Sequence, residues 1–136
     1  MPNRWLLKTE PGTYSWAELA RDGRTVWDGV KNPLALKHLR EMAKGDEAFI
    51  YHSGSEKAAV GIARVASAPY VDPKKKDPRL VVVNLESVRA LAKPARLADM
   101  RGNPKLAGFD LLRLPRLSVM PVPAAVWAEI LRMAAA

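Results

Sequence analysis

The sequence predicts a single α+β domain whose small, mixed or antiparallel sheet curls into a barrel. Expected strands dominate the middle of the chain, whereas expected helices fall mostly toward its ends. A length of 136 residues suits one hydrophobic core, and no repeat or linker divides the chain. A hydrophobic share of 49% with 26% charged residues is typical of a globular protein. We therefore treat residues 1–136 as one domain.

The first half of the chain is expected to alternate strands and helices. Residues 5–8 form a short apolar strand. Ser15 then caps a helix, because Glu18 stands three residues later and completes a capping box. Residues 25–28 form a second short strand. Apolar residues recur at helical spacing from Pro33 to Lys44, and proline suits the first turn of a helix.

The second half is expected to be mainly extended. Residues 47–52 and 59–65 predict a hairpin, and the β-branched run over 79–88 predicts a long strand. Three prolines and a lysine run over 69–78 predict an exposed loop between them. The remaining expected elements are helical turns over 95–100 and 104–107, a strand over 117–122 and a C-terminal helix opened by Pro123.

The charge balance favours a polyanionic partner. Lys plus Arg number 22 against 14 for Asp plus Glu, a net charge of +8 with a pI near 10.0. Such an excess on a small domain attracts nucleic acid. No apolar run approaches a membrane span, and the start of the chain does not resemble a signal peptide. The absence of cysteine excludes disulfides and fits a cytoplasmic location, where we expect a monomer.

Templates for catalysis are missing, so we expect no catalytic residues, no cofactor and no metal. The two histidines, His38 and His52, cannot supply a usual zinc site without cysteine. No nucleophile-elbow, phosphate-loop or dinucleotide-binding motif occurs. His52 and Ser53 are neighbours in a strand, where adjacent side chains face opposite ways. A carboxylate pair of Glu10 and Asp28 stays open as an alternative.

Three polar blocks follow strand ends, each beside an aromatic ring. They are Lys8-Thr9-Glu10, Trp27 to Asn32, and Tyr51-His52-Ser53. A flat ring together with edge-reading polar groups is what recognition of a single base requires. Structural alternatives are also open. Trp27 could belong to the core, as we expect of Trp5, Trp16 and Trp127; Asn32 could cap a helix, and Lys8 could pair with Glu10 at the surface.

The same blocks carry a resemblance to a known family. Lys8 to Pro11, Tyr14-Ser15, Trp27 to Asn32, Gly45-Asp46, Tyr51 to Ser53, Gly61 to Ala63 and Arg116 to Val122 are similar in order and spacing to the EVE domain. The match runs from Trp5 to about Leu131. The resemblance implies a PUA-like fold, a β-barrel with flanking α-helices, related to modules that read modified bases. It also implies binding of a modified nucleotide in DNA or RNA without a reaction.

The resemblance also implies a set of site residues. The expected ligand-binding residues are Lys8, Thr9, Glu10, Trp27, Asp28, Asn32, His52, Ser53, Leu80, Arg116, Leu117 and Ser118. Trp27 would stack on a base, while Glu10, Asn32 and Ser53 would read its edge. Lys8 and Arg116 would hold flanking phosphates. Further backbone phosphates would meet Lys31, Lys74, Lys75 and Lys76.

This chain departs from the family pattern at a few positions. Thr9 stands for a commoner serine and Lys31 for an arginine, which loses a bidentate fork for phosphate. Leu80 stands where similar domains usually carry an aromatic residue, so stacking there is weakened. We expect a domain that reads a modified base, such as a modified cytosine in DNA or a modified nucleotide in RNA. The alternatives are an enzyme acting on a modified nucleotide and a general basic RNA-binding accessory.

Overall fold

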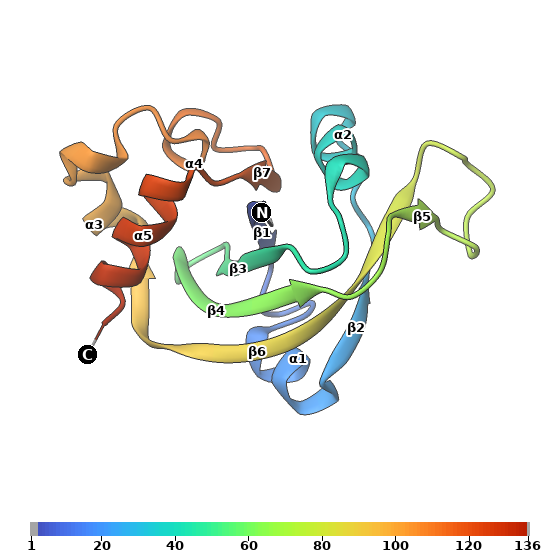
Figure 1. The fold of residues 1–136 in the computed structure, drawn as a ribbon, viewed down its shortest axis with the longest axis horizontal. Helices are drawn as coiled ribbons and strands as arrows, with labels where there is room; N and C mark the ends of the chain where they lie inside the picture. The colour runs from blue at the N-terminus through green and yellow to red at the C-terminus, as the bar shows by residue number, and fades with distance from the viewer. Residues whose placement is uncertain (1–2, 136) are drawn as a thin grey trace.

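The computed structural model describes residues 3–135, so Met1, Pro2 and Ala136 of the expected domain lie outside the described residues. Figure 1 shows a strongly curved sheet with helices around it. The strands are β1 (Arg4–Thr9), β2 (Arg24–Trp27), β3 (Glu47–His52), β4 (Ala58–Val65), β5 (Tyr70–Val71), β6 (Val81–Arg96) and β7 (Val119–Pro121). The helices are α1 (Trp16–Asp22), α2 (Pro33–Glu41), α3 (Leu97–Arg101), α4 (Asp110–Arg113) and α5 (Ala124–Met133), with a 3-10 turn at Pro104–Leu106.

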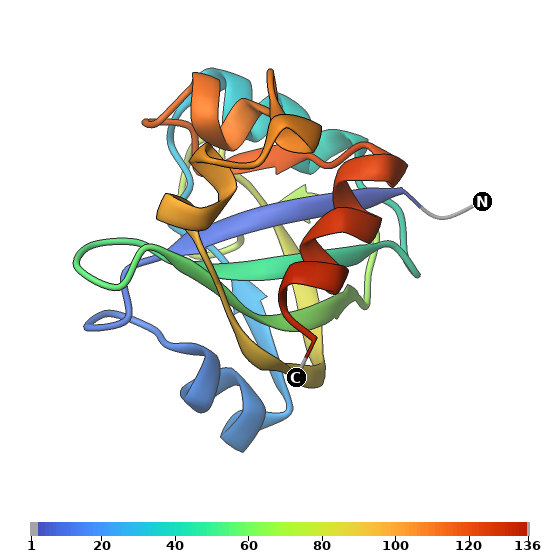
Figure 2. The same cartoon turned by 90° about the vertical axis from the view of Figure 1, so that its left-hand side faces the viewer.

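The sheet is mixed and curls without closing. Its strands run in the order β2-β6-β4-β3-β1-β7, while β5 pairs with β6 off this path. β1 pairs with β3 in parallel, and the remaining pairs are antiparallel. Among residues 3–135, no pairing joins the two end strands, β2 and β7. The α+β class is confirmed, and the expected barrel is a curved sheet with an open seam between β2 and β7 (Figures 1 and 2).

Local signals place the first two helices, and tertiary contacts set where α2 ends. The capping box of α1 is present, with the Ser15 hydroxyl accepting from the Glu18 amide. α2 begins at Pro33 as expected, but it ends at Glu41 rather than Lys44. The buried Asp46 carboxylate accepts hydrogen bonds from the Ala43 amide and the Trp5 indole. These bonds hold the chain in a turn where helical periodicity alone would have continued the helix.

β6 is much longer than the strand that the sequence pattern predicts over residues 79–88. Its 16 residues span Val81–Arg96, whereas the β-branched run ends near residue 88. The first part of β6 pairs with β2, and β4 pairs along much of it with two register shifts. Such bulges bend a strand and increase its twist, so one strand can wrap around the core. β5, inside the expected loop, and α4 are two short elements that the sequence pattern missed.

One hydrophobic core lies inside the curved sheet and under the helices. Trp5, Trp16 and Trp127 are buried in it, as expected. The rings of Phe49 and Trp127 stack with centroids 3.9 Å apart, which attaches α5 to the sheet. No helix within residues 3–135 is long and apolar enough to cross a bilayer.

Candidate functional site

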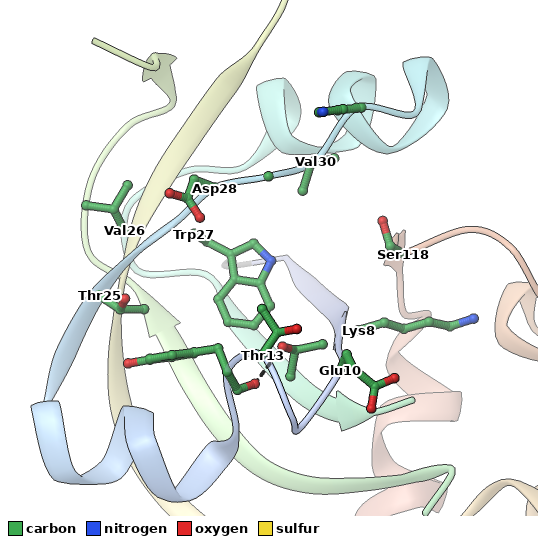
Figure 3. Close-up of a pocket in the computed structure, with 13 residues that line it drawn as sticks. Lys8, Glu10, Thr13, Thr25, Val26, Trp27, Asp28, Val30 and Ser118 are labelled. Atoms are coloured by element: carbon green, nitrogen blue, oxygen red, sulfur yellow. Dashed lines mark hydrogen bonds between the residues drawn. The ribbon is translucent and has the colours of Figure 1, made fainter. Parts of the chain in front are cut away.

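A cavity lies at the open seam of the sheet. It has a volume of about 550 Å³ and will be called the seam cavity. One wall comes from the end of β1 and the following turn, a second from β2 and the segment before α2, and a third from the residue before β7 (Figure 3). Its lining residues are Lys8, Thr9, Glu10, Thr13, Tyr14, Thr25, Val26, Trp27, Asp28, Gly29, Val30, Lys31 and Ser118.

The β1 wall is held by hydrogen bonds to neighbouring segments. The Lys8 ammonium donates to the carbonyl of Pro115 at 2.8 Å, and it lies 5.8 Å from the centroid of the Tyr51 ring. Partial burial lowers the pKa of Lys8. The Thr9 hydroxyl donates to the Tyr14 carbonyl at 2.6 Å, which closes the turn after β1. Among the described residues Lys8 forms no ion pair with Glu10, so the surface-pair alternative does not hold.

Glu10 stands at the rim of the seam cavity. Its backbone carbonyl accepts from the amides of Thr13 and Tyr14, which fixes the turn. Its carboxylate packs against Gly54, where an added Cβ would lie 2.9 Å from Oε2. Gly54 also has a φ of +82°, so the β3–β4 loop requires glycine there for two reasons. Glu10 is one of the residues that line the seam cavity (Figure 3).

Residues of the third polar block, Tyr51-His52-Ser53, hydrogen-bond to segments that line the cavity. The Ser53 amide and hydroxyl both donate to the Thr9 carbonyl, at 2.9 and 3.2 Å. His52 is buried, and its Nε2 accepts from the Trp16 amide at 2.9 Å. His52 and Ser53 do not line the seam cavity. They instead position β1 and the start of α1, which carry two of its sides.

Trp27 belongs to the core and to the cavity at once. It is only 7% exposed, and its ring meets Tyr14 edge-on with centroids 6.5 Å apart. Within residues 3–135 its indole nitrogen has no hydrogen-bond partner, yet it is not sealed from solvent. Figure 3 shows this nitrogen on the side of the cavity where Ser118 lies. The exposed part of Trp27 is therefore an edge bearing a free N–H donor, with little open ring face.

Asn32, Leu80, Arg116 and Leu117 lie outside the seam cavity. The Asn32 carboxamide oxygen caps α2 by accepting from the amides of Leu34 and Ala35, as the structural alternative proposed. With Arg116 and Leu117, it lines an adjacent hollow of about 330 Å³. Leu80 lines a different hollow, of about 440 Å³, between α2 and the β5–β6 loop. Lys31 lines both that hollow and the seam cavity.

Six lining residues were missed at the sequence level: Thr13, Tyr14, Thr25, Val26, Gly29 and Val30. Tyr14, Gly29 and Val30 lie inside sequence blocks that are similar to the EVE domain, so the resemblance could have indicated them. Thr25 could have been found from Trp27, since alternate residues of a strand share a face. The Tyr14 hydroxyl donates to Asp22 at 2.9 Å, and burial raises the pKa of Tyr14.

The seam cavity combines hydrogen-bond donors, hydrogen-bond acceptors and charged groups. It offers an indole N–H donor, the carboxylates of Glu10 and Asp28, hydroxyls, and the ammonium groups of Lys8 and Lys31. In the part of the chain that the structure describes, no group of three or more His, Asp or Glu side chains could hold a metal ion. The cavity is polar on its rim and aromatic at its back, an arrangement typical of small-ligand sites.

Comparison with known proteins identifies the family. The EVE domain model matches residues 3–133. Mouse thymocyte nuclear protein 1 is 31% identical, over 90% of this chain and 69% of the relative. A crystal structure of an Agrobacterium tumefaciens protein is 35% identical with a TM-score of 0.94, covering 97% of this chain and 92% of that one.

Two structures solved with nucleic acid also share the fold. Human thymocyte nuclear protein 1, in complex with DNA containing 5-methylcytosine, is 27% identical with a TM-score of 0.87, covering 97% of both chains. The YTH domain of Zygosaccharomyces rouxii MRB1, solved with N6-methyladenosine RNA, has a TM-score of 0.60 at 14% identity, covering 99% of this chain and 88% of that one. The latter likeness concerns the fold alone, and it agrees with the expected PUA-like architecture. The chain belongs to the EVE domain family.

Proposed function

We propose that this EVE domain binds a modified base of DNA or RNA in the seam cavity and catalyses no reaction on it. The observation that carries the proposal is the free indole N–H of Trp27, held at the back of a cavity with two carboxylates and two lysines at its sides. A volume of about 550 Å³ falls within the roughly 300–1,000 Å³ of small-ligand sites. The fold shared with human thymocyte nuclear protein 1 in complex with 5-methylcytosine DNA supports the same ligand class.

The base enters the cavity after leaving its stack, which costs a few kcal/mol in a duplex and less in a single strand. The Trp27 N–H donates to an acceptor on the base. The carboxylates of Glu10 and Asp28 accept from an exocyclic amine, since ionised carboxylates are acceptors only. This arrangement favours cytosine- or adenine-type bases over thymine or uracil. Contact between the base and the exposed edge of Trp27 replaces the full-face stacking expected from sequence.

Positive charge at the cavity suits the sugar–phosphate chain of the ligand. Lys8 and Lys31 line the cavity, and neither forms an ion pair among residues 3–135. An ammonium group has three N–H donors, so Lys8 can hold a phosphate oxygen while it donates to the Pro115 carbonyl. The carboxylates of Glu10 and Asp28 line the same cavity and are available as acceptors for the base.

The test compares short single strands that differ only in one central base: 5-methylcytosine, cytosine or thymine. We expect the 5-methylcytosine strand to bind about four- to tenfold more tightly than the cytosine strand, because one methyl group is buried. Thymine carries the same methyl group but lacks the exocyclic amine, so it should bind about tenfold more weakly than 5-methylcytosine. Fluorescence anisotropy at one fixed salt concentration measures all three affinities.

The variant Trp27→Phe tests the cavity itself. It removes the N–H and part of the ring while keeping an aromatic in the core, whereas alanine would cost about 3–5 kcal/mol of stability. Trp127→Phe is the matched control, since Trp127 is equally buried but does not line the cavity. The preference for the modified strand should weaken in Trp27→Phe and persist in Trp127→Phe. Equal affinity of the wild type for all three strands would refute the proposal, and a turned-over nucleotide would favour an enzyme.

A further inference from the structure

A second hollow adjoins the seam cavity. It lies between α2 and the β5–β6 loop, has a volume of about 440 Å³ and will be called the α2 hollow. Figure 1 shows α2 and this loop on the same side of the molecule. Lys31 lines both the α2 hollow and the seam cavity, so the two are neighbours across one side chain. A nucleic-acid strand with one base in the seam cavity must continue across the protein surface beside that cavity.

The lining of the α2 hollow combines an apolar floor with cations. Pro33, Leu36 and Leu80 supply the apolar part, and Lys31, Arg40 and Arg79 supply the positive charge. The single acid in the lining, Asp77, is bound by Arg79 through two side-chain bonds of 2.8 and 3.0 Å. That guanidinium holds the pKa of Asp77 at about 2. Among the described residues, neither Lys31 nor Arg40 forms an ion pair with a carboxylate, and Arg40 donates to a backbone carbonyl.

The two walls of the α2 hollow are tied together. Arg40 Nη2 on α2 donates to the Arg79 carbonyl on the loop at 2.9 Å. The loop is itself held by two turns: the Asp72 carboxylate accepts from the Lys74 amide, and the Asp77 carboxylate accepts from the Arg79 amide, each at 2.9 Å. Asp72 is buried. The run Lys74 to Lys76 therefore belongs to a loop whose backbone is held by these two hydrogen-bonded turns.

We infer that the α2 hollow holds the nucleotide adjacent to the base in the seam cavity. Its base lies on Pro33, Leu36 and Leu80, and its phosphate lies on Lys31 and Arg40. Charge complementarity selects a nucleic acid as the occupant, because a hollow with an apolar floor and two cations that form no ion pair among the described residues matches a base and a phosphate. The inference rests on the proposed function. It adds that the domain reads one base and also grips its neighbour.

The experiment uses the full chain and a short single-stranded DNA with one central 5-methylcytosine. The neighbour on each side is replaced in turn by an abasic residue, which keeps the phosphates and removes one base. In the wild type, removal on one side should weaken binding by about five- to tenfold, while removal on the other side has little effect. If neither abasic strand binds more weakly, no base occupies the α2 hollow.

Two variants assign that effect to the α2 hollow. Leu80→Trp gives the floor an aromatic face, so the intact strand should bind about tenfold more tightly and the sensitive abasic strand should gain nothing. Arg40→Gln should weaken both strands about equally, because it removes a phosphate contact. Arg89→Gln is the matched control: Arg89 is exposed on β6 and does not line the α2 hollow. If Leu80→Trp strengthens both strands equally, or Arg89→Gln weakens binding as much as Arg40→Gln, the inference is overturned.

The two proposals fail in different ways. If the seam cavity does not read a modified base, methylated and plain strands bind alike, and Trp27→Phe has no effect on their ratio. If only the α2 hollow is wrong, the preference for the methylated strand persists while neither abasic neighbour weakens binding.

Discussion

His52 Nε2 accepts a hydrogen bond from the backbone amide of Trp16 at 2.9 Å. An amide nitrogen can only donate, so Nε2 carries no proton and the proton sits on Nδ1. Nδ1 therefore donates to the Glu56 carboxylate, 2.6 Å away. One buried imidazole joins the end of β3 to the first residue of α1, and thereby fixes the turn that bears Tyr14.

Removing that acceptor should destabilise the domain. His52→Phe keeps most of the volume but leaves the Trp16 amide buried without a partner, which costs about 1–3 kcal/mol. Urea unfolding measures the change in the free energy of unfolding. Glu56→Gln is the control and should cost less than about 1 kcal/mol, because Glu56 lies at the surface. Nitrogen NMR of the imidazole should also show Nδ1 protonated in the wild type; a protonated Nε2 would contradict the assignment.

Gly61 is required by the ring of Trp16. A Cβ at Gly61 would lie 2.3 Å from Trp16 Cδ2, closer than any real contact. We expect Gly61→Ala to destabilise the domain by at least about 1–3 kcal/mol, the usual cost of overpacking. Gly102→Ala should be nearly neutral, since its nearest neighbour would be 3.8 Å away.

The same substitution made in a Trp16→Leu background identifies the cause. If the clash is with the indole, Gly61→Ala should cost less there than in the wild type. Thermal unfolding of the four proteins completes the cycle. Equal costs in both backgrounds would show that the glycine serves the backbone of β4 instead.

Glu129 should make the free energy of unfolding depend on pH in the acidic range. Arg132 and Asn103 hydrogen-bond its carboxylate and lower its pKa from 4.5 to about 2. Because the folded pKa is depressed, the contribution is complete above about pH 4.5 and is lost as pH falls toward 2. Glu129→Gln should make the stability curve flatter between those values, as measured by urea unfolding at successive pH values. Arg132→Gln should flatten it as well, and curves parallel to the wild type in both variants would contradict this account.

The run Lys74 to Lys76 should add salt-dependent affinity for nucleic acid without adding to the preference for a methylated strand. Replacing Lys74, Lys75 and Lys76 with glutamine should reduce the slope of log K against log salt by up to about one per lysine that contacts a phosphate. The ratio of affinities for methylated and plain strands should stay unchanged. A matched triple variant, Lys44→Gln, Arg89→Gln and Lys93→Gln, also removes three exposed charges and should change the slope less. If the lysine run alone sets affinity and methylation has no effect, the domain is a general basic binder.

Elements governed by neighbouring residues could be predicted from the sequence. Ser15 with Glu18 and Pro33 with Asn32 supply their own capping groups, so both helix starts are correct. The length of β6 could not be predicted, because its second half contains Pro94 and exposed residues and is held by distant segments, namely β4 and the Ala134 carbonyl after α5. The Asp46 carboxylate that ends α2 accepts from the nearby Ala43 amide and also from Asn3 and Trp5, more than 40 residues earlier, which no local pattern shows.

The site was predictable as a set of blocks but not as individual roles. One cavity brings together residues from three separate segments of the chain: Lys8, Thr9, Glu10, Trp27, Asp28, Lys31 and Ser118. His52 and Ser53 belong to the same family blocks, yet their side chains turn to the backbone of Trp16 and Thr9. A strand alternates its side chains, but the sequence does not say which side faces the ligand and which supports it. The Leu80 position borders the α2 hollow and does not line the seam cavity, so the aromatic missing there leaves the lining of the seam cavity unchanged.

Because the seam between β2 and β7 is open, the walls of the seam cavity belong to strands that are not paired with each other. β2 is held by β6, whereas Lys8 and Ser118 belong to segments held by β3 and by each other. No shared ladder of backbone bonds among residues 3–135 fixes the width between these walls. Substitutions on either wall can therefore reshape the recess while the hydrogen-bonded framework stays in register.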